Sequence, residues 1–403
     1  MRKFGAELEL LIVNEKGIPI TWKNWLDLKS VFIEVLPDKK EIKDITGSFL
    51  GFEIPGLGTI GLDSSASLFE LGIEPSENIE SAMEKISRLI KFVEKTLKHK
   101  GYKIFWKSQY PGMIDRENYN RRFSRRGLYP ILRKIWKWDH HELYLSASFQ
   151  PAIDVDPVEL PHVLNAIFVT SPIYISRFGG NGKYLNYYEY RLKAWELMIK
   201  NSPIDKNMLG IPYFFTDTKN YLDSLLNTRA KIIGNYKHGE RIFFVEPVSG
   251  REVIHGTTGQ KLTKVYDMEK DEFDYENVYI KGNDLILQMD WWVFWDARWR
   301  FGKRNGFVRT HWKNPFDLVL NEIDYSYIEI RHIGTPENPE KLREIFTSFL
   351  RLFESSQMIL KVAERYELFE NLNLARSMAI KHGFLPENHR KFEQFLIGEG
   401  VIP

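Results

Sequence analysis

Apolar and polar residues alternate in several short segments of the chain, and this period of two predicts β-strands. In the stretch FGAELELLIV, residues 4–13, the apolar side chains Ala6 and Leu8 share one face of a strand, while Glu7 and Glu9 share the other. Further strands are predicted at 45–54, 67–73, 143–150, 241–246, 285–295 and 325–333. Strands with one apolar and one polar face are typical of an antiparallel sheet with helices behind it.

Other segments have the longer period of helices. From Ile79 to Leu97, apolar residues recur every three or four positions, which predicts an amphipathic helix with Ser76 as its N-cap and Gly101 as its end. A second long helix is predicted from Asn338-Pro339 toward Met358, because a cap residue followed by proline is typical of a helix start. Further helices are predicted near 157–170, 187–200, 217–227 and 371–382.

No long linker rich in Ser and Gly or in Pro divides the sequence, and it contains no internal repeat. The simplest organisation is therefore a single domain over residues 1–403, with an α+β fold whose sheet turns its polar face toward a ligand.

The composition narrows the possible functions. With 403 residues, of which 43% are apolar, the chain can bury a large core, and its net charge of +2 does not indicate a protein specialised for nucleic acid or a membrane surface. The absence of cysteine excludes disulfides, thiolate zinc sites, iron–sulfur clusters and cysteine nucleophiles. A bound metal would therefore be held by oxygen or imidazole ligands.

The start of the chain, MRKFGAELEL, lacks the apolar region of a signal peptide, and no segment approaches the ~18 apolar residues of a membrane span. We therefore expect a cytoplasmic protein with no membrane contact. The lack of cysteine together with abundant Lys and Glu is also typical of a thermophile.

Carboxylates recur on the polar faces of the predicted strands. Besides Glu7 and Glu9, GLDSSASLFELGIEP places Asp63 in a turn and Glu70 on a strand, and DYSYIEIRHIG places Glu329 beside Arg331. Carboxylates on one sheet face repel each other unless cations lie among them, and Mg²⁺ commonly joins a few carboxylates to substrate phosphates. A lone E-x-E strand is more simply a solvated face, and spacing alone does not show that these strands are neighbours.

Several stretches together resemble the glutamate–cysteine ligase type 2, or carboxylate–amine ligase, family of the glutamine synthetase superfamily. The resemblance rests on GAELEL, on D-x6-E at Asp63 and Glu70, and on EIR at 329–331. It is supported in chain order by NAIFVTSPIYISRFGGN, YEYRLKAWELM, WWVFWDARWR and NLNLARSMAIKHGF. It thus covers nearly the whole chain.

The resemblance implies a curved, mostly antiparallel six-stranded sheet that forms a funnel-shaped cleft, with ATP and two or three Mg²⁺ ions, or Mn²⁺, in its mouth. It implies that Arg331 and Glu329 are catalytic, that Arg191 and Arg298 bind the nucleotide, and that the metal ligands are Glu7, Glu9, Asp63, Glu70 and Glu329.

The implied reaction activates an amino-acid carboxylate, with the γ-carboxylate of glutamate as the first expectation, as an acyl phosphate that an amine attacks. The implied partners are a small amino acid and an amine, and relatives indicate a homo-oligomer. The sequence lacks the G-x-x-x-x-G-K-[ST] string of a P-loop, which agrees with this fold.

One departure concerns the metal site. Family members carry HVHVG-like histidines on the strand that here reads LYLSASFQP, where this chain has Ser146, Ser148 and Gln150. A metal ligand is therefore missing, which implies two strong sites rather than three, or an altered activity. His140 and His141 lie just before this strand, but adjacent histidines on a strand point to opposite faces. Gly334, where relatives are often acidic, is a smaller departure.

A basic and aromatic strip, residues 118–138, contains seven Arg or Lys residues and no acidic residue. Three interpretations of this strip are open. It is a solvated helical face or subunit contact, or it is an anion site that serves the nucleotide or an acidic substrate. The third interpretation is a nucleic-acid site. An alternative function is therefore a non-catalytic protein that binds an anionic partner through this strip. The tryptophan cluster, which is more typical of core packing, comprises Trp291, Trp292, Trp295 and Trp299.

Overall fold

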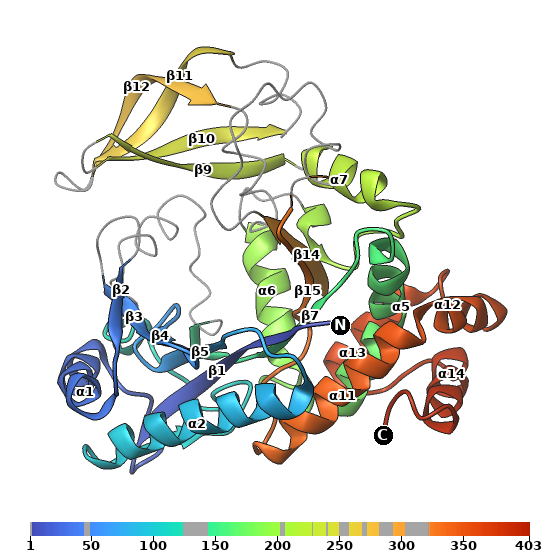
Figure 1. The fold of residues 1–403 in the computed structure, drawn as a ribbon, viewed down its shortest axis with the longest axis horizontal. Coiled ribbons are helices and arrows are strands. Elements are labelled where there is room, and N and C mark those ends of the chain that lie inside the picture. The colour runs from blue at the N-terminus through green and yellow to red at the C-terminus, as the bar shows by residue number, and fades with distance from the viewer. Residues whose placement is uncertain are drawn as a thin grey trace.

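The computed structural model describes residues 2–43, 49–123, 144–201, 206–227, 229–238, 241–249, 258–267, 272–281, 293–302, 321 and 323–403. Most of the 118–138 strip, together with His140, His141, Trp291 and Trp292, lies outside these residues. The chain has the predicted α+β architecture, in which helices pack on a large antiparallel sheet (Figure 1).

The main sheet has nine strands among the described residues, in the order β14-β15-β7-β1-β5-β4-β3-β2, and β6 also pairs with β1. The strands are β1 (Phe4–Asn14), β2 (Lys40–Lys43), β3 (Phe49–Ile54), β4 (Gly58–Leu62), β5 (Leu68–Ile73), β6 (Tyr102–Phe105), β7 (Phe149–Asp154), β14 (Ala297–Gly302) and β15 (Tyr325–Ile330). The predicted number of six is therefore too small, because β3 and β2 extend one edge and β6 pairs with the second half of β1. The funnel shape stays a prediction.

The described residues form two further sheets. One is antiparallel, in the order β12-β11-β10-β9, with β9 (Arg229–His238), β10 (Arg241–Ser249), β11 (Thr258–Asp267) and β12 (Glu272–Lys281). The other is a short parallel pair, β8 (Leu209–Gly210) and β13 (Phe294–Trp295).

The described residues contain ten α-helices. They are α1 (Trp22–Val35), α2 (Ile79–Lys98), α3 (Arg116–Asn120), α5 (Leu160–Phe178), α6 (Tyr190–Asn201), α7 (Thr218–Asn227), α11 (Glu340–Glu354), α12 (Ser356–Arg365), α13 (Leu372–His382) and α14 (Glu387–Gly398). No helix in the described part of the chain is long and apolar enough to cross a membrane.

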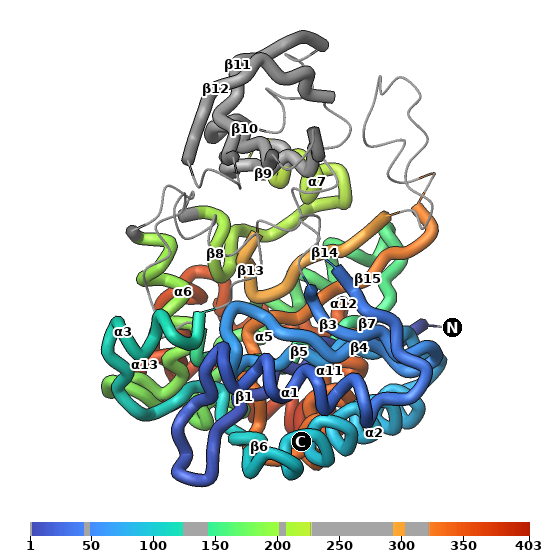
Figure 2. Tube along the Cα trace, turned by 90° about the vertical axis from the view of Figure 1, so that its left-hand side faces the viewer, coloured from blue at the N-terminus to red at the C-terminus, as the bar shows by residue number. Residues whose placement is uncertain are grey.

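Helices α2, α5 and α11 cover the apolar face of the main sheet, as Figures 1 and 2 show from two sides. The ring of Phe346 on α11 lies 5.9 Å from that of Phe4 on β1 and 6.1 Å from that of Phe149 on β7, measured between centroids. Leu8 on β1 and Ile328 on β15 are fully buried on the same face. Burial of each such side chain contributes about 1.5–3 kcal/mol, so this face holds the sheet on its helices.

Three boundaries of helices and strands differ from those predicted from the sequence. Asn78, not Ser76, caps α2 by accepting a hydrogen bond from the Ser81 amide, because Ser76 pairs through its backbone with Phe4. The helix predicted toward residue 358 ends at Glu354, and a new helix begins at Ser356. The strand predicted at 143–150 begins only at Phe149.

Candidate active site

The polar face of the main sheet brings the predicted carboxylates into one region. Glu9 lies opposite Glu70 on β5, and Glu7 lies opposite Gly72 on β5 and Gln150 on β7. Strand β7 also pairs with β15, which carries Glu329. The alternation read from the sequence therefore places Glu7, Glu9, Glu70 and Glu329 on neighbouring strands.

Three arginines surround Glu329, which is 3% exposed. Arg298 on β14 stands directly opposite it and donates from Nε and Nη2 to its two carboxylate oxygens, both at 3.1 Å. Arg331 forms an ion pair with the same carboxylate, and Arg300 lies 3.6 Å from it. Burial alone would raise the pKa of Glu329, but the three guanidinium groups lower it to about 2. Glu329 is therefore an ionised carboxylate at neutral pH.

Glu7 lies on the same face of the sheet, and its pKa is raised where that of Glu329 is lowered. Burial and the charge of Glu329 raise its pKa above the ordinary value, and the arginines oppose this only in part. The Glu7 and Glu329 carboxylates thus repel each other across the sheet. A cation placed between them would relieve this repulsion.

Glu9 is held by neutral donors. Its Oε2 accepts hydrogen bonds from both the amide and the hydroxyl of Ser148, each at 2.7 Å, and its Oε1 accepts one from Gln150 Nε2 at 3.3 Å. Burial and the nearby charge of Asp63 raise the pKa of Glu9 to about 7, while Arg191 and the Ser148 donors act against this rise.

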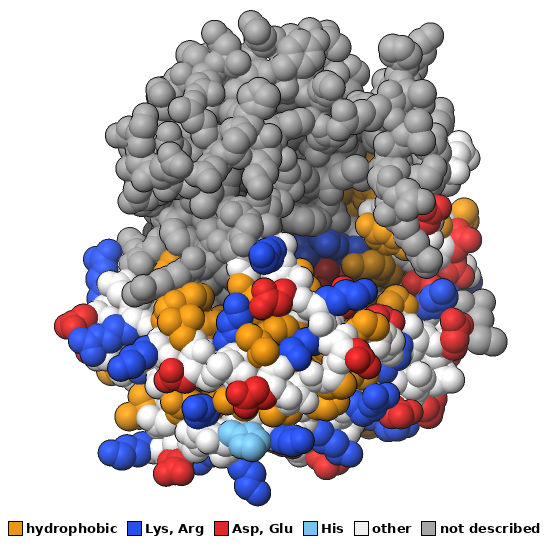
Figure 3. Space-filling model, turned by 60° about the vertical axis from the view of Figure 1, so that its left-hand side comes forward, with side chains coloured by type: hydrophobic (Ala, Val, Ile, Leu, Met, Phe, Trp, Pro, Cys, Tyr) orange, Lys and Arg blue, Asp and Glu red, His pale blue; other side chains and the backbone are white. Residues whose placement is uncertain are grey.

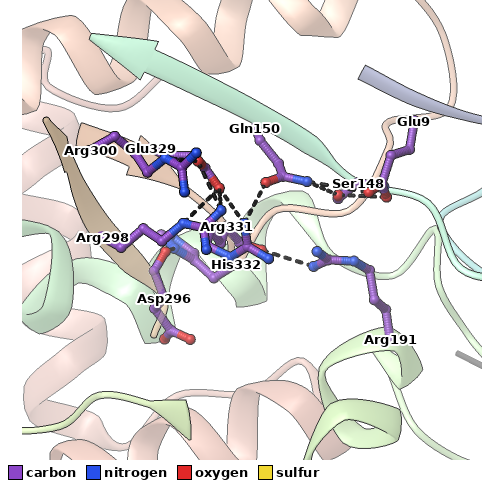
Figure 4. Close-up of polar contacts among 10 residues, drawn as sticks. All are labelled: Glu9, Ser148, Gln150, Arg191, Asp296, Arg298, Arg300, Glu329, Arg331 and His332. Carbon is purple, nitrogen blue, oxygen red and sulfur yellow. Dashed lines mark hydrogen bonds and ion pairs between the residues drawn. The ribbon is translucent and has the colours of Figure 1, made fainter. Parts of the chain in front are cut away.

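Gln150 joins the two halves of the site (Figure 4). Its Nε2 donates to Ser148 Oγ at 2.9 Å as well as to Glu9, and its Oε1 accepts from Arg331 Nη1 at 3.0 Å. A continuous chain of polar contacts therefore runs from Glu9 through Gln150 to Arg331 and Glu329.

Arg191 reaches this region from α6 and donates from Nη1 to the backbone carbonyl of Arg331 at 2.9 Å (Figure 4). It is 4% exposed, and burial lowers the pKa of its guanidinium while the charges of Glu9 and Glu189 oppose the change. Glu189 is itself buried, and burial raises its pKa to about 7. Arg191 is thus a buried cation beside the Glu9 half of the site.

A cavity of about 220 Å³ opens beside Glu7 and Glu329. Its polar lining also includes Lys3, Asp154, Tyr327 and Gln150, and small residues line it as well. Small residues line part of it: Gly5 stands opposite Ala152, and a Cβ at Gly72 would lie 2.7 Å from Thr59 Oγ1. The site therefore contains a cavity next to its charged centre.

The predicted metal ligands form pairs. Among the described residues, no group of three or more His, Asp or Glu side chains is arranged to hold a metal ion. The repulsive contacts are instead between Glu7 and Glu329 and between Glu9 and Asp63. Mg²⁺ commonly binds one or two carboxylates together with substrate phosphates and water, so these pairs fit an ion that arrives with a nucleotide.

Sequence reasoning missed some residues of this network. Arg300 and Tyr327 gave no local signal, because a strand of alternating Arg and aromatic residues is also typical of an ordinary surface strand. Ser148 and Gln150 were recognised only as replacements for histidine, yet both bind Glu9. Gly334 has a steric reason, since a Cβ there would lie 2.4 Å from the Ser108 Cβ.

Comparison with solved structures identifies the fold. The chain is similar to glutamate–cysteine ligase from Francisella tularensis, solved in complex with AMP, with a TM-score of 0.50 and 14% identity over 100% of this chain and 79% of that one. The chain shares the fold of a glutamate–cysteine ligase. A bifunctional glutathione synthetase from Pasteurella multocida matches with a TM-score of 0.40 and 11% identity over 100% of this chain and 45% of that one. No protein-family model and no curated protein matches the sequence.

Within this ligase fold, the tryptophans in the described part of the predicted cluster are core residues. Trp295 is 1% exposed and Trp299 is fully buried, and both rings contact Tyr221 edge to face. The packing interpretation of these two residues is confirmed.

Proposed function

We propose that the chain is an ATP-dependent carboxylate–amine ligase, which activates an amino-acid carboxylate, in the first instance the γ-carboxylate of glutamate, and joins it to an amine. The observation that carries the proposal is Glu329 held by Arg298, Arg300 and Arg331 beside the second carboxylate, Glu7. A site with dense positive charge next to paired acids suits a phosphorylated anion with its counter-ion. The shared ligase fold supports the same reaction class.

The reaction has two steps with balanced bonds. A carboxylate oxygen of the amino acid attacks the γ-phosphorus of ATP, the bond from that phosphorus to the β,γ-bridging oxygen breaks, and ADP leaves. The amine nitrogen then attacks the carbonyl carbon of the acyl phosphate, loses a proton, and phosphate departs with the original carboxylate oxygen. The first step converts a poor leaving group into a good one.

The arginines supply the electrostatic part of the mechanism. Arg331 is oriented by Glu329 and Gln150, and we assign it to the γ-phosphoryl group during transfer, where its charge stabilises the transition state. Arg298 holds Glu329 in place from β14. Arg191 is assigned to a carboxylate of the amino acid or to the nucleotide, because it is a buried cation at the Glu9 half of the site, held to the Arg331 carbonyl through Nη1.

We assign Glu7, Glu9, Asp63, Glu70 and Glu329 to binding of Mg²⁺, or Mn²⁺, which when bound screens the repulsion between the substrate carboxylate and the triphosphate. Two ions match the two repulsive pairs, Glu7 with Glu329 and Glu9 with Asp63. Gln150 stands opposite Glu7, at the strand where relatives have histidine, and its amide is engaged by Glu9 and Arg331. Two ions are therefore the expected number.

The 220 Å³ cavity is assigned to the nucleoside part of ATP. The paired small residues Gly5 and Ala152 give a flat surface for a planar base, and Lys3, Asp154 and Tyr327 supply polar contacts at its edge. Ala152→Leu would fill this floor without entering the core. We expect it to weaken ATP binding about tenfold or more while circular dichroism and thermal unfolding stay unchanged. Tight ATP binding by this variant would remove the assignment.

The function is tested by incubating the purified chain with ATP, Mg²⁺, glutamate and a panel of amines, and measuring amine-dependent ADP release. Glutamate labelled with oxygen-18 in its γ-carboxylate should transfer one labelled oxygen to the released phosphate, which mass spectrometry detects. ADP release without label in the phosphate would indicate ATP hydrolysis by water and would contradict the acyl-phosphate mechanism.

A further inference from the structure

An ion pair behind the sheet connects the C-terminal helices to the candidate active site. Arg376 on α13 donates from Nε and Nη2 to the two carboxylate oxygens of Asp296, both at 2.7 Å. Arg376 is 6% exposed and Asp296 is 2% exposed. Ser171 on α5 donates to the same carboxylate, and Glu196 on α6 accepts from Arg376 Nη1 at 3.2 Å.

The backbone of Asp296 contacts the segment that carries Arg331. Its carbonyl accepts hydrogen bonds from the Arg331 amide at 2.8 Å and from His332 Nδ1 at 2.9 Å, and its own amide donates to the Gly210 carbonyl at 2.8 Å. Asp296 immediately precedes β14, whose first residue, Ala297, pairs with Ile330 at the end of β15. The same residue therefore holds Arg376 through its side chain and Arg331 through its backbone.

The position of this backbone determines what Arg331 can reach. Just beyond β15, the Arg331 side chain turns to Glu329 and Gln150, and its carbonyl accepts from Arg191. A displacement of about 1 Å in such a segment can lower the rate of a reaction by about a hundredfold. Fixing the Arg331 backbone is thus a requirement of the site.

Packing alone does not explain why the charged pair of Arg376 and Asp296 occupies this position. Helix α13 already buries Leu372, Ala379 and Ile380, and apolar side chains of similar volume stabilise a core as well as a buried ion pair does. Burial alone would raise the pKa of Asp296, but Arg376 holds it below the ordinary range, so the aspartate stays charged.

We propose that Arg376 is a positioning residue for Arg331, acting through Asp296, so that the ion pair between α13 and the start of β14 fixes the orientation of the site arginine. The effect on turnover rests on the proposed ligase function, whereas the effect on the Arg331 backbone does not.

The test compares Arg376→Met, which keeps the length of the side chain, with Arg376→Lys, which keeps its charge. Leu396→Ala serves as the control, because it removes a fully buried side chain of α14, whereas Asp296 is held by Ser171 on α5 and Arg376 on α13. Hydrogen exchange of the Arg331 amide is measured in all three, together with kcat and KM for ATP. Because the Arg331 amide donates its hydrogen bond to the Asp296 carbonyl, the exchange rate of this amide reports local opening of the segment directly.

We expect Arg376→Met to speed exchange of the Arg331 amide about tenfold or more and to lower kcat about tenfold or more, with a smaller change in KM. Arg376→Lys should change both the exchange rate of the Arg331 amide and kcat less than Arg376→Met does. In Leu396→Ala any increase in exchange rate should be similar for all core amides, and kcat should stay unchanged.

The outcomes separate the two proposals. Faster exchange at Arg331 in a chain that has no ligase activity would support the positioning role and contradict the proposed function. Unchanged exchange at Arg331 in Arg376→Met, or a loss no different from that in Leu396→Ala, would overturn the positioning role. If Arg376→Met does not fold, Ser171→Ala, which removes one donor to Asp296 and keeps both charges, provides the same comparison with a smaller expected increase in exchange.

Discussion

Two carboxylates on one face of one sheet, Glu329 and Glu9, differ in how their charge is balanced. Glu329 is surrounded by three arginines, and its pKa falls to about 2. Glu9 is bound by Ser148 and Gln150, lies near Asp63, and its pKa rises to about 7. The difference shows that the side chains around each carboxylate, and not the acid itself, set its pKa on this sheet.

The described side chains on the face drawn in Figure 3 do not show this contrast. Acidic and basic side chains are interspersed over the face drawn in Figure 3, in agreement with the net charge of +2.

Arg331→Ala should have the largest effect, because it removes the arginine assigned to the transferring phosphoryl group. We expect kcat to fall by a factor of about 10³ or more, as for other arginines that contact a transferring phosphoryl group. The loss of stability should be no larger than that of Arg298→Met, since Glu329 keeps Arg298 and Arg300. Steady-state ADP release and calorimetry measure the two quantities. A large loss of stability with kcat retained would give Arg331 a structural role.

Glu7→Gln tests the Glu7 carboxylate of the repulsive pair that Glu7 forms with Glu329. The substitution removes the charge that Glu329 opposes, so stability should be equal or slightly higher, while turnover should be lost because the assigned metal ligand is gone. Turnover across a Mg²⁺ series and thermal unfolding provide the measurement. Full activity at low Mg²⁺ would exclude Glu7 as a ligand.

Arg298→Met should destabilise the Glu329 half. Removing one partner of a buried ion pair costs about 3 kcal/mol, at the low end of the usual range because two arginines remain. Arg300→Met is the matched control, since Arg300 lies 3.6 Å from the carboxylate and is 20% exposed in its side chain, and its loss should cost less. Denaturant unfolding compares the two, and equal losses would show that Glu329 does not depend on Arg298 in particular.

Glu189→Gln should change the pH dependence of stability. The folded pKa of Glu189, about 7, lies above the ordinary 4.5, so the folded state binds more protons than the unfolded state between these values. Its contribution is full below about pH 4.5 and is lost as the pH rises to about 7, a loss of about 3 kcal/mol at most. The difference in unfolding free energy between wild type and Glu189→Gln, followed by denaturant titration over this range, should therefore decline with pH. A constant difference would mean that Glu189 has an ordinary pKa.

Ser148→Ala should have the smallest effect. It removes the hydroxyl bond to Glu9 but leaves the backbone amide bond, so the cost is about 1–2 kcal/mol, and the pKa of Glu9 should rise further. Denaturant unfolding near neutral pH measures the loss, and NMR titration of the Glu9 carboxylate measures the pKa. A lowered pKa would show that the Ser148 hydroxyl does not favour the charged carboxylate.

The periodicity of the sequence was sufficient to predict the two faces of β1 and β15, because alternation is a local property of a strand. It could not predict that β14 supplies Arg298 and Arg300, since strand pairing depends on segments about 30 residues apart in the chain and on packing against the helices. The role of Ser148 and Gln150 was also hidden, because a neutral side chain acquires its meaning only beside Glu9. The single domain, the cytoplasmic location and the homo-oligomer stay predictions.

Strand β1 lies inside the main sheet, and its two neighbours near Glu7 are β5 and β7. During synthesis β1 emerges long before β7, so its edge on that side must wait for about 140 further residues to be translated before it can pair. The acids gathered on this strand therefore meet their partners late in folding. We expect a nascent chain that stops before β7 to bind chaperones, because its β1 edge and apolar face are still uncovered.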